Sequence, residues 1–392
     1  MHVELTIANS LPRDYQSSTL VGRIWQPGIG PTVVAIDGDQ LRDLSGQFTT
    51  MADLVADTNP AEAVQSALSS APIIASLTEL LANSGSTGNN DQQPWLLSPI
   101  DLQAVKAAGV TFVASMLERV IEEQAKGNPA AANNIRQTIN QEIGADLTHI
   151  VPGSADAEKL KQVLQDRGMW SQYLEVGIGP YAEVFTKSQP MSSVGSGMDV
   201  GLHDESGWNN PEPEVVLVVN AQGNIVGVTL GNDVNLRDFE GRSALLLGKA
   251  KDNNGSCSLG PFIRLFDQHF TLTDAKQLEI GLIIDGDDGF KLQASSSMNQ
   301  ISRDLEDLVK QTLNVNHQYP DGLVLFTGTM FAPTQDRDQP GVGFTHKEGD
   351  RVIITNPKLG SLINRVDRSS AIPPWTFGVG ELMKNLAQRG LL

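Results

Sequence analysis

The residues with the clearest chemical potential are acids at the start of an apolar run. Glu212 and Glu214 lead into the run 215–219, and a third acid, Asp233, follows Glu214 after nineteen residues. Residues i and i+2 of a strand share one face, so the two glutamates are expected side by side. Neighbouring carboxylates at a buried strand edge repel each other and lose hydration, and a divalent cation removes both costs. Oxygen ligands suit Mg²⁺, Mn²⁺ or Ca²⁺ rather than zinc or copper.

The alternative is a pair of glutamates in water at a sheet edge, which Pro213 would mark. Two other segments carry polar groups of interest. Lys251 precedes a stretch of small and polar residues that suits either a ligand-binding loop or a solvated one. The run 323–331 is typical of a buried strand and passes through Thr327-Gly328-Thr329, whose hydroxyls and N–H groups can bind a carboxylate.

Several familiar motifs are absent from the sequence. Asp285-Gly286-Asp287 begins a stretch that resembles a calcium loop, but Ser296 stands where an EF-hand needs its bidentate glutamate. The six histidines show no zinc-binding spacing, and no serine lies in a Gly-x-Ser-x-Gly elbow. Neither zinc chemistry nor nucleophilic hydrolysis therefore has support in the sequence.

The composition excludes further classes of protein. A formal net charge of −18 over 392 residues argues against nucleic acid and against anionic membrane surfaces as partners. The single cysteine excludes an internal disulfide. No apolar run approaches the roughly 20 residues of a membrane helix, and the N-terminus lacks the features of a signal peptide. We therefore expect a soluble, cytoplasmic protein.

The patterning predicts an α+β chain in two domains, 1–95 and 96–392, joined by a linker over 83–94. Few strands alternate with helices, which disfavours a doubly wound parallel sheet and favours an antiparallel roll. The predicted strands lie in 19–36 and in many short runs beyond 173, with a hairpin over 278–294. The predicted helices cover 50–57, 61–82, 101–126, 129–145, 155–167, 235–251 and 301–313.

Taken together, these segments resemble the fumarylacetoacetate hydrolase family. That family carries Glu-x-Glu, an aspartate about twenty residues later, a lysine in the next loop and a Thr-Gly-Thr strand. The corresponding residues here are Glu212, Glu214, Asp233, Lys251 and Thr327–Thr329, and Phe185-Thr186-Lys187 with Ser192-Ser193 also agrees. The resemblance implies a mixed β-sandwich roll with a smaller N-terminal domain, a helical lid region, and a homodimer or homotetramer.

The likeness is greater to one branch, the 2-keto-3-deoxy-pentonate dehydratases. It rests on the segments 109–112, 115–123, 208–214, 231–242, 318–322 and 374–378. The family's hydrolases carry His-x-x-Glu on the lid helix, whereas this chain has Ser115-Met116-Leu117-Glu118. The resemblance therefore implies Mg²⁺-dependent dehydration of 2-keto-3-deoxy-D-xylonate (4,5-dihydroxy-2-oxopentanoate) to 2,5-dioxopentanoate. The C4 stereochemistry of the substrate, xylonate- or arabinonate-derived, is left open.

The resemblance also implies roles for individual residues. Mg²⁺ would be held by Glu212, Glu214 and Asp233. The remaining assignments are Lys251 for proton transfer or for stabilising the enolate, Glu118 or Glu122 as acid for the leaving hydroxyl, Ser115 and Arg119 for substrate hydroxyls, and Thr329 with Lys187 for the substrate carboxylate. The alternative for 115–123 is a charged, solvated helix face. Two other functions stay open: an acylpyruvate C–C hydrolase using His203, and a metal-binding protein without catalysis.

Overall fold

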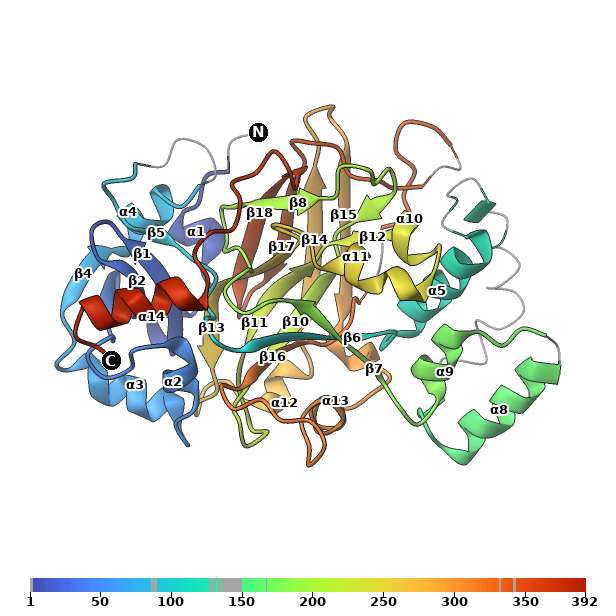
Figure 1. Cartoon of the computed structure of the whole chain (residues 1–392), viewed down its shortest axis with the longest axis horizontal. Helices are drawn as coiled ribbons and strands as arrows, with labels where there is room; N and C mark the ends of the chain where they lie inside the picture. The colour runs from blue at the N-terminus through green and yellow to red at the C-terminus, as the bar shows by residue number, and fades with distance from the viewer. Residues whose placement is uncertain are drawn as a thin grey trace.

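A computed structural model gives the fold of residues 3–85, 90–126, 150–166, 168–330, 333–340 and 343–392, together with residues 128, 131, 132 and 135. Two sheets packed against each other form the centre, and short helices surround them (Figure 1). The fold is α+β with mixed sheets, as the sequence predicts.

The larger sheet joins distant parts of the chain. In sheet order its strands are β4 (Ile73–Ser76), β3 (Gln40–Asp43), β2 (Gly30–Asp37), β1 (Leu20–Gln26), β13 (Cys257–Leu265), β11 (Ile225–Asp233), β10 (Pro213–Val219), β16 (Leu323–Phe326), β6 (Ala104–Gly109) and β7 (Glu183–Ser188), with β5 (Trp95–Leu96) beside β1. β16 and β6 are parallel, and the pairs around them are antiparallel. β1 pairs with β13, so the sheet continues from the N-terminal segment into the rest of the chain. The division at residue 95 stays a prediction.

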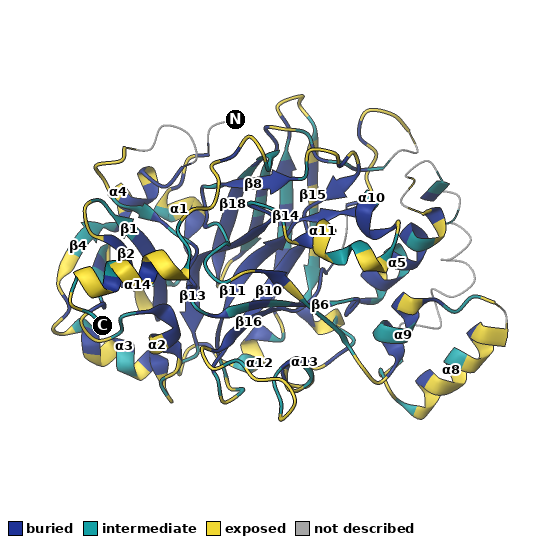
Figure 2. Ribbon diagram, viewed as in Figure 1, coloured by how far each residue is buried: buried dark blue, intermediate teal, exposed yellow. Residues whose placement is uncertain are grey.

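The smaller sheet covers one face of β10 and β11. Its strands, in order, are β15 (Lys291–Ser297), β14 (Glu279–Asp285), β17 (Arg351–Asn356), β18 (Gly360–Arg368) and β8 (Asp199–Leu202), and a separate ribbon pairs β9 (Asn209–Asn210) with β12 (Asn235–Leu236). Val215 and Leu217 pack in one cluster with Leu282 of β14, whereas Val216 and Val218 pack in a second cluster. β10 is thus buried on both faces, which explains its unbroken apolar sequence (Figure 2).

Most helices lie at the two ends of the sheets, and others lie below their middle in the view of Figure 1. Those near the N-terminal strands are α1 (Ile7–Ser10), α2 (Met51–Val55), α3 (Pro60–Leu68), α4 (Leu77–Ala82) and α14 (Val379–Gln388); the others are α5 (Val113–Ala125), α8 (Ala155–Asp166), α9 (Gln172–Ile178), α10 (Arg237–Glu240), α11 (Leu247–Lys251), α12 (Leu272–Ala275) and α13 (Leu305–Thr312), with 3₁₀ turns η1 (Tyr15–Ser17), η2 (Ala244–Leu246) and η3 (Met298–Gln300). α5 packs Met116 and Val120 in one cluster with Leu174 of α9. Within the described residues, no helix is long and apolar enough to cross a lipid bilayer.

Some predicted elements are wrong in detail. The first part of the helix predicted over 101–126 is the strand β6, because pairing with β16 and β7 overrides the helix propensity of its alanine-rich sequence. The helix predicted over 61–82 ends before Pro72, after which β4 and α4 form. The helix predicted over 235–251 is divided among β12, α10, η2 and α11.

Other predicted elements are confirmed. The region 19–36 holds β1 and β2, the hairpin over 278–294 is β14 and β15, and α8 and α13 match the helices predicted over 155–167 and 301–313. Most of the helix predicted over 129–145, and part of the linker over 83–94, lie outside the described residues.

Candidate metal centre and active site

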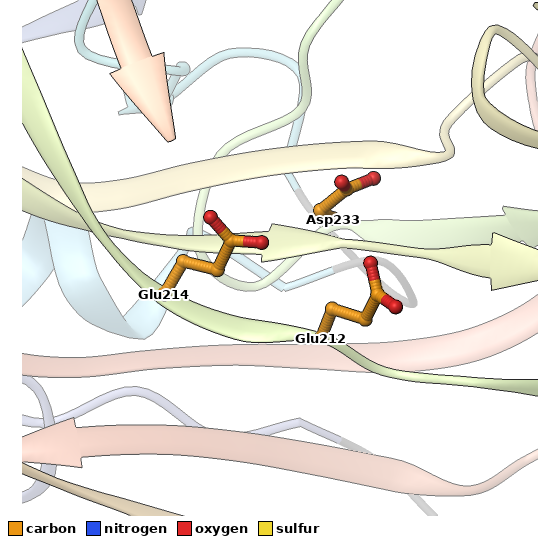
Figure 3. A group of neighbouring side chains, drawn as sticks. All are labelled: Glu212, Glu214 and Asp233. Atoms are coloured by element: carbon orange, nitrogen blue, oxygen red, sulfur yellow. The ribbon is translucent and has the colours of Figure 1, made fainter. Parts of the chain in front are cut away.

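Three buried carboxylates meet where β10 begins and β11 ends. The two strands pair antiparallel with Glu214 opposite Gly231, so Asp233 at the end of β11 returns to the glutamates. Glu212 joins the same register because its carbonyl accepts the N–H of Asp233 at 3.0 Å. Carboxylate oxygens of the three residues lie within 4.8 Å of one another (Figure 3). The i, i+2 pair and the more distant aspartate thus converge as the sequence predicts.

The electrostatics of the three acids favour a bound cation. Burial, together with the nearby Asp233 and Glu212, raises the pKa of Glu214 well above its ordinary value. The Gly328 N–H donates to Glu214 Oε2 at 2.7 Å and offsets part of this cost. Three buried acids with oxygens this close suit a hard divalent cation, because each supplies an oxygen ligand. The residues present therefore fit Mg²⁺.

The hydrogen bond from Gly328 to Glu214 requires a glycine at this position. Its φ of 101° is unfavourable for other residues, and a Cβ atom would lie 2.0 Å from the Thr111 hydroxyl oxygen. Thr327 fixes the bend, since its hydroxyl donates to the Val215 carbonyl at 2.9 Å. The Thr-Gly-Thr segment therefore delivers a backbone N–H to Glu214, one of the three candidate metal ligands, and Thr329 then lines the cavity.

Two lysines stand against the carboxylates. Lys251, at the end of α11, places Nζ 2.6 Å from Glu212 Oε2 and 3.0 Å from Asp233 Oδ2. Burial alone would lower the pKa of Lys251, but Asp233 and Glu212 outweigh it and raise that pKa above the ordinary value. With the carboxylates as its neighbours, Lys251 is therefore held as an ammonium ion. The base role that the resemblance implies for it stays a prediction.

Lys187 lies behind Asp233 and is fully buried. Its Nζ is 3.0 Å from Asp233 Oδ1 and also contacts the carbonyl oxygens of Val234 and Lys251. Burial would raise the pKa of Asp233, yet Lys187 and Lys251 together lower it. Lys187 thus contacts Asp233, a candidate metal ligand, rather than lining the cavity.

An arginine on α5 connects that helix to the metal centre. Arg119 contacts Glu212, and its Nη1 lies 2.7 Å from Glu122 and 2.9 Å from Glu240. Glu122 is also 3.1 Å from Arg237 Nε, so both of its oxygens are engaged in buried ion pairs. Arg119 therefore lies within the site, whereas Glu122 ties α5 to α10.

The cavity between these groups is small, at about 10 Å³, close to the volume of one water molecule. A five-carbon acid can enter only if surrounding side chains move. The lining residues are Ala108, Gly109, Val110, Ser115, Arg119, Glu183, Phe185, Glu212, Glu214, Asp233, Glu240, Lys251 and Thr329. Of the predicted site residues, Lys187, Glu118 and Glu122 do not line it.

Glu183 is the notable residue that the sequence did not single out. It is half-buried at the start of β7, and burial followed by repulsion from Glu240 raises its pKa to about 7. Among the described residues its carboxylate has no hydrogen-bonding partner. The signal in the sequence was the strand period of two, since Glu183 and Phe185 share one face of β7, whereas Lys187 lies at the register shift between Thr186 and Ser188. Glu240, also missed, lies one helical turn after Arg237 in α10.

Residues 180–367 match the family described as fumarylacetoacetate (FAA) hydrolase, C-terminal. The match covers just under half of the chain and confirms the resemblance inferred from its motifs.

Curated relatives share about a third of their aligned residues with this chain. A probable 2-keto-3-deoxyxylonate dehydratase of Haloferax volcanii is 33% identical over 202 residues, which is 52% of this chain and 66% of that protein. A 2-dehydro-3-deoxy-D-arabinonate dehydratase of Saccharolobus solfataricus is 32% identical over 190 residues, or 48% of this chain and 60% of that protein. A mitochondrial oxaloacetate tautomerase of Rattus norvegicus is 31% identical over 193 residues, 45% and 56% of the two chains. The match thus spans about two thirds or less of each relative.

Solved structures share the fold. A 2-keto-3-deoxy-D-arabinonate dehydratase complexed with magnesium and 2,5-dioxopentanoate has a TM-score of 0.59 at 22% identity, covering 89% of this chain and 99% of its own. A fumarylacetoacetate hydrolase from Exiguobacterium antarcticum has a TM-score of 0.54 at 16% identity, covering 90% and 100%. At these identities the likeness establishes the fold alone.

Proposed function

We propose that the protein is a Mg²⁺-dependent dehydratase that converts 2-keto-3-deoxy-D-xylonate (4,5-dihydroxy-2-oxopentanoate) to 2,5-dioxopentanoate and water. The observation that carries the proposal is that an ammonium group and an unpartnered carboxyl group line the same cavity as three metal-binding acids. The names of the two archaeal relatives support this substrate class.

Glu212, Glu214 and Asp233 would hold the Mg²⁺ ion. When bound, the ion would polarise the 2-oxo group of the substrate and increase the acidity of its C3 protons. Lys187 and Lys251 keep Asp233 ionised and ready as a ligand. Asp233 would therefore stay ionised even at pH values below the ordinary pKa of an aspartate.

Lys251 would stabilise negative charge on the substrate. The reaction removes a C3 proton and the C4 hydroxyl as water, which leaves a C3–C4 double bond. A proton then leaves C5 and one is added at C3, and the resulting C4–C5 enol tautomerises to the aldehyde. An ammonium group beside the metal ligands would stabilise the negative charge that develops on the 2-oxo oxygen while the C3 proton leaves. Arg119 supplies a second fixed positive charge, at the other carboxylate oxygen of Glu212.

We assign Glu183 as the acid for the departing C4 hydroxyl. A carboxyl group with a pKa of about 7 is partly protonated at neutral pH and can give its proton to a leaving oxygen. Glu122, the alternative from the sequence, is engaged with Arg119 and Arg237. Glu118 is outside the cavity lining. The position of Glu183 therefore favours it over both glutamates of α5.

A C–C hydrolase is less well supported. Hydrolysis needs a base for water, and among the described residues no histidine lines the cavity. His203 instead packs against Phe239, with 5.2 Å between ring centroids, and its Nδ1 accepts the Glu205 N–H.

A tautomerase is the second candidate, favoured by the relative from Rattus norvegicus. Tautomerisation needs the same removal of a proton next to a ketone, but no leaving hydroxyl. A carboxyl group such as Glu183 can transfer a proton in either reaction, so loss of the C4 hydroxyl is what distinguishes the two.

The test is to follow products by NMR from both C4 epimers of the 2-keto-3-deoxy-pentonate, an acylpyruvate and enol-oxaloacetate. We expect 2,5-dioxopentanoate from at least one epimer, with the xylonate-derived acid preferred. Pyruvate from the acylpyruvate, or ketonised oxaloacetate, without turnover of either deoxy acid would exclude the dehydratase. Preference for the arabinonate-derived epimer would correct the substrate while retaining the reaction.

A further inference from the structure

A second cavity lies beside the N-terminal strands of the larger sheet. Its volume is about 360 Å³, within the range of small-molecule sites. Among the described residues it shares none of its lining with the carboxylate cavity. It forms where β1, β5 and the segments 191–194 and 372–377 meet, and the proposed reaction does not use it.

Aromatic rings fixed to one another form one wall. Trp25 stacks on Trp95 with 5.8 Å between centroids and an interplanar angle of 21°, and Phe377 meets Trp25 edge-on at 5.2 Å. Trp375 joins them, since its Nε1 donates to the Phe377 carbonyl at 2.9 Å. Three of the five tryptophans of the chain therefore line one cavity. Such a preorganised wall suits a flat ring.

The polar element of this cavity is a buried arginine. Arg23 is 4% exposed, and its Nη1 donates to the carbonyl of Ile100. Its Nη2 reaches the sulfur of Met191 at 3.9 Å, which is a weak acceptor. The nearest carboxylate, Asp101, is 3.6 Å from Nε and already accepts the backbone N–H of Met51. Nη1 also donates to the Ser98 carbonyl at 3.4 Å, so within the described part of the chain Nη2 is the group that lacks an oxygen acceptor.

The other charged residue of the lining does not compensate Arg23. Asp199 is engaged by Arg365, which donates to both of its oxygens at 2.9 and 2.7 Å. The hydroxyls of Ser98 and Ser193 bond to each other at 2.7 Å. The cavity therefore presents an aromatic wall and a buried guanidinium group that is paired with Asp101 through Nε, while among the described residues its Nη2 has only the Met191 sulfur as an acceptor.

We infer that this cavity binds a small molecule with a planar aromatic ring and a carboxylate, the ring lying against the tryptophans and the carboxylate on Arg23. Guanidinium Nη groups suit carboxylates in charge-assisted hydrogen bonds. The inference is independent of the reaction proposed for the other cavity.

Isothermal titration of the full chain with 2-naphthoate tests this inference, with the uncharged 2-naphthamide and D-xylose as comparisons. We expect saturable binding of 2-naphthoate and at least tenfold weaker binding of the amide. Trp375→Ala, at a residue 45% exposed, leaves the fold intact and should weaken binding of 2-naphthoate roughly tenfold. Arg23→Lys should weaken binding of 2-naphthoate more than binding of 2-naphthamide, because lysine lacks the paired N–H donors with which a guanidinium group binds a carboxylate.

Tyr181→Ala is the matched control, since Tyr181 is an exposed aromatic residue outside this cavity. It should leave binding unchanged. No saturable binding of 2-naphthoate, equal affinity for acid and amide, or unchanged binding in Trp375→Ala would each overturn the inference. Binding of D-xylose in preference to 2-naphthoate would overturn it as well.

Discussion

Replacing Lys251 by methionine tests how the negative charges of the three carboxylates are compensated. The substitution keeps most of the side-chain volume but removes the charge that lies 2.6 Å from Glu212 and 3.0 Å from Asp233. Removing one partner of a buried ion pair costs about 3–5 kcal/mol, because the remaining charges are left uncompensated. At ~2.1 cal/mol/K of unfolding entropy per residue, such a loss lowers the Tm of a chain this long by roughly 4–6 °C.

Mg²⁺ should reverse most of that loss. A cation held by the same carboxylates supplies the missing positive charge, so the variant should gain more stability from Mg²⁺ than the wild type does. Thermal unfolding with EDTA and with saturating Mg²⁺ measures both values. Lys249→Met is the matched control, since Lys249 is an exposed lysine of the same helix, α11, and its Tm should barely change.

Equal losses of Tm in EDTA and in Mg²⁺ would refute this reasoning. That result would mean that the cation does not interact with the carboxylates that Lys251 contacts.

Four further outcomes are expected. Glu214→Gln should weaken Mg²⁺ binding by more than the roughly 10–100-fold typical of outer-sphere partners, measured by calorimetry. Glu183→Gln should lower kcat by about 10²–10⁴ with Mg²⁺ affinity unchanged; a fully active variant would remove Glu183 from the mechanism. The dehydration rate of the wild type should decline as the pH rises through about 7, because Glu183 is protonated below that pH and loses its proton above it. A rate that rises over this range would contradict the assignment. Gly109→Ala would place a Cβ 2.0 Å from Glu183 Oε2, and should reduce turnover but not Mg²⁺ binding, whereas Gly46→Ala, with open space around it, should change neither.

The convergence of the three acids could be predicted from sequence because their geometry is local. The i, i+2 spacing of Glu212 and Glu214 sets their common face, and the residues up to Asp233 are enough for two antiparallel strands and a turn. An apolar run flanked by acids therefore carries most of the information needed to place the three carboxylates.

Glu183 could not be predicted because its position depends on pairing between distant segments. It lies opposite Gly109 in the β6–β7 pair, and β6 has a sequence that favours helix. Only the neighbouring strands make that segment extended, and a single sequence does not report the register of such pairing. For Glu122, the sequence showed that it lies one helical turn after Glu118. The sequence did not show the ion pair between Glu122 and Arg237 of α10, because that contact joins two distant helices.

The most direct test is to titrate chelator-treated protein with Mg²⁺ while recording both the heat of binding and the formation of 2,5-dioxopentanoate. The account predicts one ion per chain and a dehydration rate that returns in the same titration, with neither response in Glu214→Gln. Full turnover in the chelated protein, or Mg²⁺ binding that survives in Glu214→Gln unchanged, would contradict it.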